Sequence, residues 1–515
     1  MTEKISGRVV VNSKKECILD HWNAIENQPA STLKDLFDAD PDRVGQLSFE
    51  QSGIYFDFSK THMDSMLLEN FRKLADDKGL SDKIEALTSG VAINISEGRA
   101  AEHTAERGFG AETSVENARL LKNRMQGLVQ AIEAGALGDI EYIIHLGIGG
   151  SALGPQLILE ALKIGDEKYK TAVISNIDGC ALEPVLEHFD AHKTLLVIAS
   201  KSFTTAETFL NARSVTDWMI EQGVSDPFGK IIALTAMPEK AVEWGIDENR
   251  VLPFSETVGG RYSLWSSIGF SIALTLGVDV FDDLLAGAAE MDRHFKESPF
   301  DSNIPAIAAV CDQYYSQVRN CETRAVFAYD ERLRLLPDYL QQLEMESNGK
   351  SVTADGKPLD RHSSPIVWGG VGTDAQHAVF QLLHQGTHLV PVEFLAVIEP
   401  GHSLDKEHHQ GLLLNCFAQG AALMAGKKSD DTNRNYPGDR PSVTLLLDEL
   451  DGRTLGALIA FYEHRTFVNA VLLGINPFDQ FGVELGKEMA NALLAGEGNQ
   501  MDSSTERLKN RAFPA

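Results

Sequence analysis

The feature that constrains this chain most is a series of short apolar runs separated by amphipathic segments. From residue 141 onward, YIIHL, TAVIS, TLLVIAS and KIIALTA recur at spacings of about 25 to 35 residues, as expected for successive βαβ units. RAVFAY, PIVWGG and LVPVEFLAVI follow after a helical stretch at residues 279–318. Such runs are typical of parallel strands buried on both faces by helices. We therefore predict an α/β protein with two doubly wound parallel sheets.

The changes in pattern along the chain divide it into five expected parts. These are a helical N-terminal arm at 1–115 without a strand-rich core of its own, a first α/β domain at 116–285, a helical connection at 286–319, a second α/β domain at 320–500, and a charged tail at 501–515. A polar loop is expected at residues 426–442.

Composition narrows the possible functions. Asp and Glu number 74 against 46 Lys and Arg, a formal net charge of -28, so nucleic acid would be repelled at long range. The five cysteines are odd in number and form no C-x-x-C pair, unlike a disulfide framework or a cysteine zinc site. The N-terminus lacks an apolar core of signal-peptide type, and no apolar run is long enough to span a membrane. We therefore expect a cytoplasmic protein without nucleic-acid or membrane partners.

Two loops that follow predicted strands carry residues suited to binding phosphate. Glycines in GIGGSALGP let backbone N–H groups approach an anion at the start of the next helix. The same stretch satisfies the dinucleotide pattern G-x-G-x-x-G/A through Gly147, Gly149 and Ala152. The ribose-binding acid of that pattern has no clean candidate, because Asp178 lies farther away and beyond the next predicted strand, and a purely structural turn is a further alternative. After the third run, Lys201 is surrounded by hydroxyls, where helix capping needs only one. The hydroxyls belong to Ser200, Ser202, Thr204 and Thr205.

A carboxylate and an arginine are candidates for catalysis. Residues 332–345 predict a helix that places Glu346 at its end, before an Asn348-Gly349 pair that predicts a left-handed cap. The negative end of the helix dipole suits a proton-accepting carboxylate, and a solvated glutamate without a function is the alternative. Arg261 follows two glycines, where its guanidinium fits either an oxyanion or a structural salt bridge.

A histidine and a lysine complete the candidate set. Thr373 and Gln376 fit a capping box that places His377 in a helix's first turn, where a neutral ring exchanges protons near pH 7; a core histidine is the alternative. Asp479 is expected to cap a helix that carries Gln480 and Lys487 on one face, although Lys487 would also suit a surface ion pair with a glutamate three residues away. The histidines at 402, 408 and 409 lack the spacing of a zinc site, so no metal is expected.

A phosphate anchor with these groups suits proton transfer beside a sugar-phosphate carbonyl, which needs neither metal nor redox cofactor. GIGGSALGP, ASKSFTTAET, VGGRYSLWSSIG, ESNGKS, GTDAQHAVFQLLHQGT and NPFDQFGVELGK resemble, in this order, the phosphoglucose isomerase family, from about Asn94 to the end of the second domain. The resemblance implies domains of sugar isomerase (SIS) type and a cofactor-free homodimer that interconverts glucose 6-phosphate and fructose 6-phosphate. A non-catalytic SIS regulator that binds sugar phosphate, and an isomerase that also accepts mannose 6-phosphate, remain open.

The resemblance also implies roles for single residues. Glu346 would move a proton between C2 and C1 through a cis-enediolate, which Arg261 would stabilise. His377 from the neighbouring subunit, oriented by Glu207, would assist ring opening together with Lys487. The implied substrate-binding residues are Gly150, Ser151, Ser200, Lys201, Ser202, Thr205 and Gln480. The chain departs from the family at Ser202, which replaces a threonine, and at Ala101 and Glu102, which replace more apolar residues.

Overall fold

The fold is known from a computed structural model, which describes residues 18, 20–163, 165–495 and 501–513. Cys17 lies outside the described residues, and the four other cysteines are free thiols. The chain divides into two compact units, and the boundary between them in the sequence lies between Pro477 and Phe478. Both sheets belong to the first unit. The domain boundaries expected from the sequence remain a prediction.

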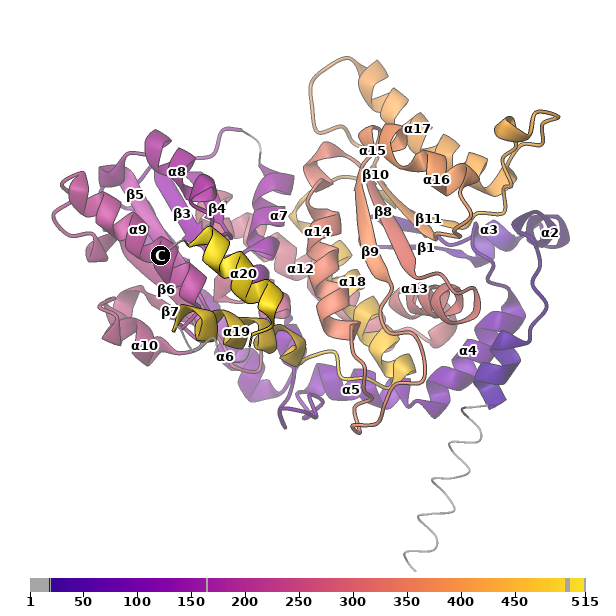
Figure 1. The fold of residues 1–515 in the computed structure, drawn as a ribbon, viewed down its shortest axis with the longest axis horizontal. Helices are drawn as coiled ribbons and strands as arrows, with labels where there is room; N and C mark the ends of the chain where they lie inside the picture. The colour runs from indigo at the N-terminus through magenta and orange to yellow at the C-terminus, as the bar shows by residue number, and fades with distance from the viewer. Residues whose placement is uncertain (1–17, 19, 164, 496–500, 514–515) are drawn as a thin grey trace, which may run out of the picture. The chain divides into compact units, whose positions relative to one another are not determined.

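The first sheet confirms the first four predicted strands. All of its strands are parallel, in the order β4-β3-β5-β6-β7, and they are drawn in purple and magenta in Figure 1. Every residue of β5 and β6 is buried, as expected for strands covered on both faces. The fifth strand, β7, has only three residues and gave no periodic signal. The bounds are β3 (Tyr142–Leu146), β4 (Lys170–Ile174), β5 (Thr194–Ala199), β6 (Ile231–Thr235) and β7 (Val251–Pro253).

The second sheet confirms the three later runs and repeats the strand order of the first. Its order is β1-β2-β11-β10-β8-β9, in which β9-β8-β10-β11 are parallel and correspond to β4-β3-β5-β6. The fold is therefore α/β with two mainly parallel sheets. The parallel strands are β8 (Thr323–Tyr329), β9 (Ile366–Val371), β10 (Val392–Val397) and β11 (Ser442–Leu447).

The N-terminal arm contains two short strands that the sequence analysis did not indicate. The arm contains the hairpin β1 (Ser48–Gln51) and β2 (Ile54–Asp57), and β2 pairs antiparallel with β11 at the edge of the second sheet. A hairpin of two four-residue strands is only marginally stable on its own, so the distant pairing with β11 is needed to fix it. The arm's helices include α2 (Leu33–Ala39), α3 (Arg43–Gln46), α4 (Ser65–Asp77) and α5 (Leu80–Ser89), and α6 (Glu112–Glu133) leads into the first sheet.

The first unit contains a long helix, α18 (Gly452–Leu473), that is buried along almost its whole length. It packs against α12 (Val278–Glu297) and α13 (Ile304–Gln313), which confirm the predicted helical stretch. The remaining helices of this unit are α7 (Leu153–Leu162), α8 (Gly179–His188), α9 (Ala206–Glu221), α10 (Pro238–Glu243), α11 (Phe270–Thr275), α14 (Leu336–Leu340), α15 (Asp374–Ala378), α16 (Phe380–Gln385) and α17 (Lys406–Ala425). The second unit contains α19 (Glu484–Leu494) and α20 (Ser503–Ala512). None of the described helices is long and apolar enough to cross a membrane.

Helix α18 carries two buried charges whose partners come from distant elements. Glu463 accepts hydrogen bonds from Trp265 (2.8 Å) and Arg107 (2.6 Å). Arg465 donates through Nε to Asp312 at 2.7 Å, and its other nitrogens reach Asp312 and Glu393 in β10. A buried charge is tolerated only when it is paired, so each contact fixes the element that supplies the partner.

Removal of Arg465 should therefore destabilise the protein strongly. In Arg465→Met, the buried carboxylates of Asp312 and Glu393 lose their closest cation and keep only the longer contacts with Arg324, at 3.7 Å and 3.2 Å. Removal of one partner of a buried pair typically costs about 3–5 kcal/mol. We expect a much lower midpoint of thermal unfolding than in the wild type. The control is Arg119→Met, which breaks an exposed pair with Glu116 and should cost at most about 1 kcal/mol. Equal midpoints for the two variants would contradict this account of the core.

Candidate active site

Both loops predicted to bind phosphate lie where the strand order of the first sheet reverses. The strands β3 and β5 are neighbours, whereas β4 lies on the other side of β3. The connections after β3 and β5 therefore leave the sheet in opposite directions and open a crevice at their carboxyl ends, the usual ligand site of such sheets. The loop after β3 forms the 3₁₀ turn η2 (Gly149–Ser151), which we call the glycine turn.

The glycine turn is pressed against other parts of the site, which explains its composition. A Cβ atom on Gly150 would lie 2.2 Å from the carbonyl carbon of Gly260, next to Arg261. Gly149 has a positive φ of 56°, and a Cβ there would lie 2.7 Å from Nε2 of Gln342. A side chain at Gly150 would push the backbone of Gly260 and Arg261 away, and the positive φ of Gly149 favours glycine there, so each position suits glycine for its own reason.

The hydroxyls after β5 do not serve as helix caps. Thr205 is the N-cap residue of α9, but its side chain makes no capping hydrogen bond. It pairs instead with the buried hydroxyl of Ser200 at 3.1 Å, while the exposed Ser202 pairs with Thr204 at 2.8 Å. The uncapped start of a four-turn helix, lined with hydroxyls, favours the phosphate interpretation over that of spare capping residues.

Sequence reasoning missed Phe203, which shapes this loop. Its φ is +50°, a left-handed conformation that is costly for an aromatic residue. The ring is buried and lies 4.9 Å from that of Phe209 in α9 and 6.4 Å from that of Trp244. We infer that this packing offsets the cost of the turn. The sequence signal for this role was the presence of a hydrophobic residue, Phe203, within a run of hydroxyl-bearing residues.

Lys201 is held by the backbone of another loop. Its ammonium donates to the carbonyls of Glu256 and Val258, both at 2.7 Å, which leaves one of its three donors for a ligand. Burial lowers the pKa of Lys201 to about 8, and the nearby guanidinium of Arg99 acts in the same direction. Arg99 also donates to the Glu256 carbonyl, at 2.7 Å. An anion bound here would meet a concentrated positive charge.

The candidate base and the candidate oxyanion-stabilising residue lie side by side. Nη1 of Arg261 is 3.5 Å from a carboxylate oxygen of Glu346, and their side chains are 2% and 19% exposed. Nε of Arg261 donates to Oγ of Ser347 at 2.6 Å, and the Tyr262 hydroxyl lies 2.9 Å from the same atom. Because Ser347 follows Glu346 directly, these bonds fix the arginine relative to the carboxylate.

The segment that carries Glu346 differs in part from the predicted helix. It consists of a 3₁₀ turn, α14 and a π-helical stretch, η11 (Gln341–Glu346), which ends at Glu346. The predicted left-handed cap is wrong, because neither Asn348 nor Gly349 has a positive φ. Lys350 ends the stretch instead, by donating to the carbonyls of Glu346 (2.7 Å) and Ser347 (2.9 Å). A π-helical turn at such a position is a frequent mark of a functional site.

Gln342 is a further residue that the sequence analysis missed. It lies in the same π-helical stretch as Glu346, and its amide nitrogen approaches Gly149 of the glycine turn. Its spacing of four residues from Glu346 was the only available signal. Gln342 therefore links the segment of the base to the phosphate loop.

His377 lies on an exposed part of α15. The predicted capping box is wrong, because Thr373 makes no side-chain cap hydrogen bond and Gln376 donates to Asn415 instead. Helix α15 has only five residues, too few for the expected dipole effect on His377. Among the described contacts, none joins His377 to Arg261 or Glu346. Glu207 is half-buried in the first turn of α9, directly after the hydroxyl-rich loop.

The two remaining candidates lie in the second unit. Gln480 is exposed and precedes the 3₁₀ turn η13 (Phe481–Val483), so it is not part of α19. Lys487 is exposed in α19. The prediction that Asp479 caps this helix is wrong, because the N-cap residue of α19 is Val483, without a side-chain cap hydrogen bond. The 3₁₀ turn displaces the start of the helix by several residues.

Comparison with known proteins agrees with this arrangement. A family model described as phosphoglucose isomerase matches residues 57–508. A glucose-6-phosphate isomerase of Rhizorhabdus wittichii is 63% identical over 96% of this chain and 98% of its own length, and one of Zymomonas mobilis is 56% identical over 96% and 98%. The crystal structure of a glucose-6-phosphate isomerase from Chlamydia trachomatis covers 96% of this chain and 99% of its own, with a TM-score of 0.89 at 29% identity. This chain belongs to the phosphoglucose isomerase family.

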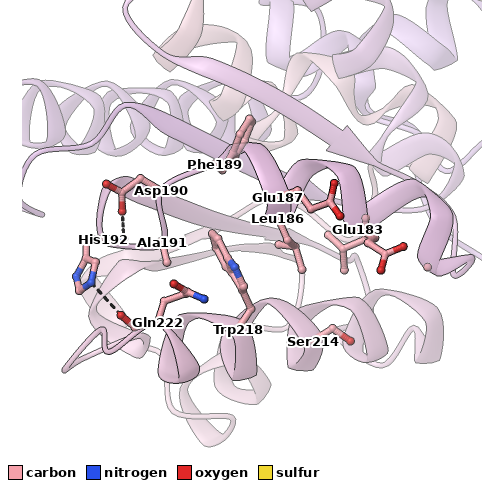
Figure 2. A pocket seen from close by; sticks show the side chains of 12 residues that line it. Glu183, Leu186, Glu187, Phe189, Asp190, Ala191, His192, Ser214, Trp218 and Gln222 are labelled. Carbon is pink, nitrogen blue, oxygen red and sulfur yellow. Dashed lines mark hydrogen bonds between the residues drawn. The ribbon is translucent and has the colours of Figure 1, made fainter.

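Membership of the phosphoglucose isomerase family favours the crevice beyond β3 and β5 over a hollow elsewhere on the first sheet's helices. Figure 2 shows that hollow, a cavity of about 830 Å³ between α8 and α9. Glu183, Glu187 and Asp190 line it, and no lysine or arginine does. Three carboxylates without a cation repel a sugar phosphate, so this hollow is not the best candidate for the site. Among the described residues, no cluster of three or more His, Cys, Asp or Glu side chains suits a metal ion.

The lowered pKa of Lys201 makes anion binding at the site dependent on pH. The free ammonium loses its proton as the pH rises through about 8. Inorganic phosphate is already largely dianionic there, so its affinity should fall above this pH as the amine becomes neutral. Titration calorimetry at constant ionic strength measures the affinity for phosphate at each pH.

Two variants make the test specific for Lys201. Lys201→Met should bind phosphate more weakly and lack the fall above about pH 8. The control Lys163→Met removes an exposed lysine paired with Glu160 and should behave like the wild type. A wild-type affinity that is constant across this pH range would refute the assignment.

Proposed function

We propose that this chain interconverts glucose 6-phosphate and fructose 6-phosphate, as the names of its relatives say of those proteins. The observation that carries the proposal is the pair of Arg261 and Glu346, 3.5 Å apart and in contact, through Gly260 and Gln342, with the glycine turn. A base beside a fixed cation, at one end of an anion site, suits the removal of a proton next to a carbonyl. The reaction moves hydrogen within one molecule and needs no external redox partner.

The phosphate group of the substrate anchors the sugar between the two loops. The glycine turn, at Gly150 and Ser151, and the side chains after β5 supply the donors. These side chains belong to Ser200, Lys201, Ser202 and Thr205. Their position at the carboxyl ends of adjacent strands lets both loops reach one phosphate. Gln480 contributes a further contact with the substrate.

Glu346 carries out the proton transfer on the opened sugar. Its carboxylate takes a proton from C2 of the aldose and returns it to C1, through a cis-enediolate. Arg261 stabilises the negative charge on the enediolate oxygens, because its guanidinium is fixed in place by Ser347 before the charge develops. For ketose to aldose, the same steps run in reverse.

The catalytic unit is a homodimer in the cytoplasm. Ring opening needs an acid and a base at the ring oxygen and the C1 hydroxyl, and His377 and Lys487 act there. The exposed His377 does not contact its own chain's Glu346 in the described structure, which suits a histidine that acts on the neighbouring subunit's site. Glu207 of that site orients the imidazole. The free cysteines suit a reducing compartment.

The basic test is turnover of fructose 6-phosphate by the purified protein in the presence of a chelator. A coupled dehydrogenase detects the glucose 6-phosphate formed, and we expect sustained turnover. If the protein binds the sugar phosphate without turnover, it is a regulator rather than an enzyme, and the proposal fails.

The identity of the base is tested by Glu346→Gln. The amide keeps the size of the side chain but accepts no proton, so kcat should fall by about 100-fold or more. The affinity for inorganic phosphate should stay close to that of the wild type. Glu331→Gln, which alters an exposed glutamate before α14, serves as the control. Near-normal turnover by Glu346→Gln would exclude this residue as the base.

The origin of His377 is tested by mixing inactive variants. If each site takes Glu346 from one subunit and His377 from the other, a heterodimer of Glu346→Gln and His377→Asn has one intact site. Unfolding and refolding the two variants together should then restore roughly a quarter of wild-type activity, because half of the dimers are mixed and each has one working site of two. Each variant refolded alone should stay inactive. No recovery in the mixture would place both residues of a site on one chain.

A further inference from the structure

We propose that His145 is a positioning residue that holds the glycine turn in the shape needed to bind the substrate's phosphate. His145 lies in β3, two residues before the glycines begin, and its side chain is fully buried. It points away from the face of the sheet where Ile144 and Leu146 join the apolar core, since side chains alternate along a strand. The inference rests on the proposed phosphate site and adds to it a residue that does not touch the substrate.

Both ring nitrogens of His145 have a partner. Nε2 lies 2.8 Å from the carbonyl oxygen of Ser151, the last residue of the glycine turn. Nδ1 lies 2.7 Å from the hydroxyl of Ser271, a buried residue of α11. A carbonyl only accepts, so Nε2 carries the proton, and Nδ1 must then accept from the Ser271 hydroxyl. Burial lowers the pKa of His145 to about 4, so the ring is neutral and keeps this pattern at neutral pH.

The histidine therefore connects the glycine turn to a rigid support. Ser271 belongs to α11, and the Thr275 hydroxyl at the end of the same helix lies 2.6 Å from that of Thr171 in β4. On its other side, the turn meets the backbone at Gly260 and Arg261 through Gly150. The Ser151 carbonyl is thus held from inside the sheet, while Gly150 is confined from the side of the active site.

Loss of His145 would release the turn without touching the catalytic groups. The Ser151 carbonyl would lose its buried donor, and the turn would relax to find another. Its N–H groups would then no longer converge on one phosphate. Glu346 and Arg261 would stay in place, because Ser347 and Lys350 hold them. Weak phosphate binding with an intact chemical step is the expected signature of such a residue.

The experiment compares three variants with a matched control. His145→Leu removes both hydrogen bonds, and Ser271→Ala removes only the donor that fixes the tautomer. His145→Gln keeps an N–H donor for Ser151 and an acceptor for Ser271. The control His294→Leu alters a partly buried histidine of α12 that also has two partners, the Ser298 hydroxyl and the Ile304 N–H. Burial lowers the pKa of His294 to about 4 as well, so both rings are neutral at neutral pH, although His294 is less buried than His145.

The readouts are KM and kcat for fructose 6-phosphate, and the dissociation constant of inorganic phosphate from calorimetry. For His145→Leu we expect KM and the phosphate constant to rise together by about tenfold, with kcat within about twofold of the wild type, which is the pattern of lost ground-state binding. Ser271→Ala should show a smaller change of the same kind, and His145→Gln should recover most of the loss. His294→Leu should lower the thermal midpoint and change neither constant.

Other results would overturn the inference. If His145→Leu lowers the thermal midpoint as His294→Leu does but leaves phosphate binding unchanged, the histidine is only structural. If His145→Leu does not fold, unchanged phosphate binding in Ser271→Ala overturns the inference instead. Calorimetry with phosphate does not depend on turnover. A wild type that binds phosphate but turns over no sugar therefore refutes the proposed function and leaves the role of His145 open to this same test.

Discussion

The structure depends on the paired charges inside helix α18. An apolar helix in this place could also pack, but apolar contacts are not specific for one neighbour. Each buried charge, in contrast, must pair with one particular partner. Glu463 holds Trp265, which lies on the same 3₁₀ segment, η6 (Gly260–Trp265), as Arg261. Arg465 and Arg324 share the carboxylate of Glu393, and Arg324 also pairs with Glu344, two residues before Glu346. The two segments that carry the proposed catalytic residues, Arg261 and Glu346, are thus fixed to one buried frame, although they are distant in sequence.

This frame explains how Arg261 and Glu346 can have a well-defined geometry although the contact between them is weak. The contact of Arg261 with Glu346 is long for an ion pair, at 3.5 Å, and by itself would not hold either side chain. Ser347 binds the guanidinium, and Lys350 binds the carbonyls that end the π-helical stretch. Catalysis by preorganised charge requires such support, since any group that must reorganise during the reaction loses part of its effect.

The sequence predicted what depends on local burial and failed where distant contacts decide. Seven strands were predicted, because a run such as 195–199 is apolar throughout, but β11, half of whose residues are only partly buried, was missed. The pair β1 and β2 was missed because its pairing with β11 spans most of the chain. The capping box at Thr373 was wrong for a related reason, since Gln376 finds a partner on α17 rather than the helix start. Motif resemblance pointed to Arg261, Glu346 and both loops. Only its spacing from Glu346 pointed to Gln342, and no local signal indicated the π-helical turn.

Net charge and the charge at the site have opposite signs, and only the second decides what binds. A chain with a net charge of -28 is unsuited to a polyanion, yet an anionic sugar is the proposed substrate. Lys201 and Arg99 both donate to the Glu256 carbonyl, and Arg261 lies near enough to lower the pKa of Lys201 further. Arg99 is paired with Glu97 at 2.8 Å, so Lys201, with one donor left for a ligand, is the cation best placed to bind a phosphate. Because screening at physiological ionic strength limits the reach of surface charges to about 8 Å, this local cation matters more for a small anion than the net charge of the chain does.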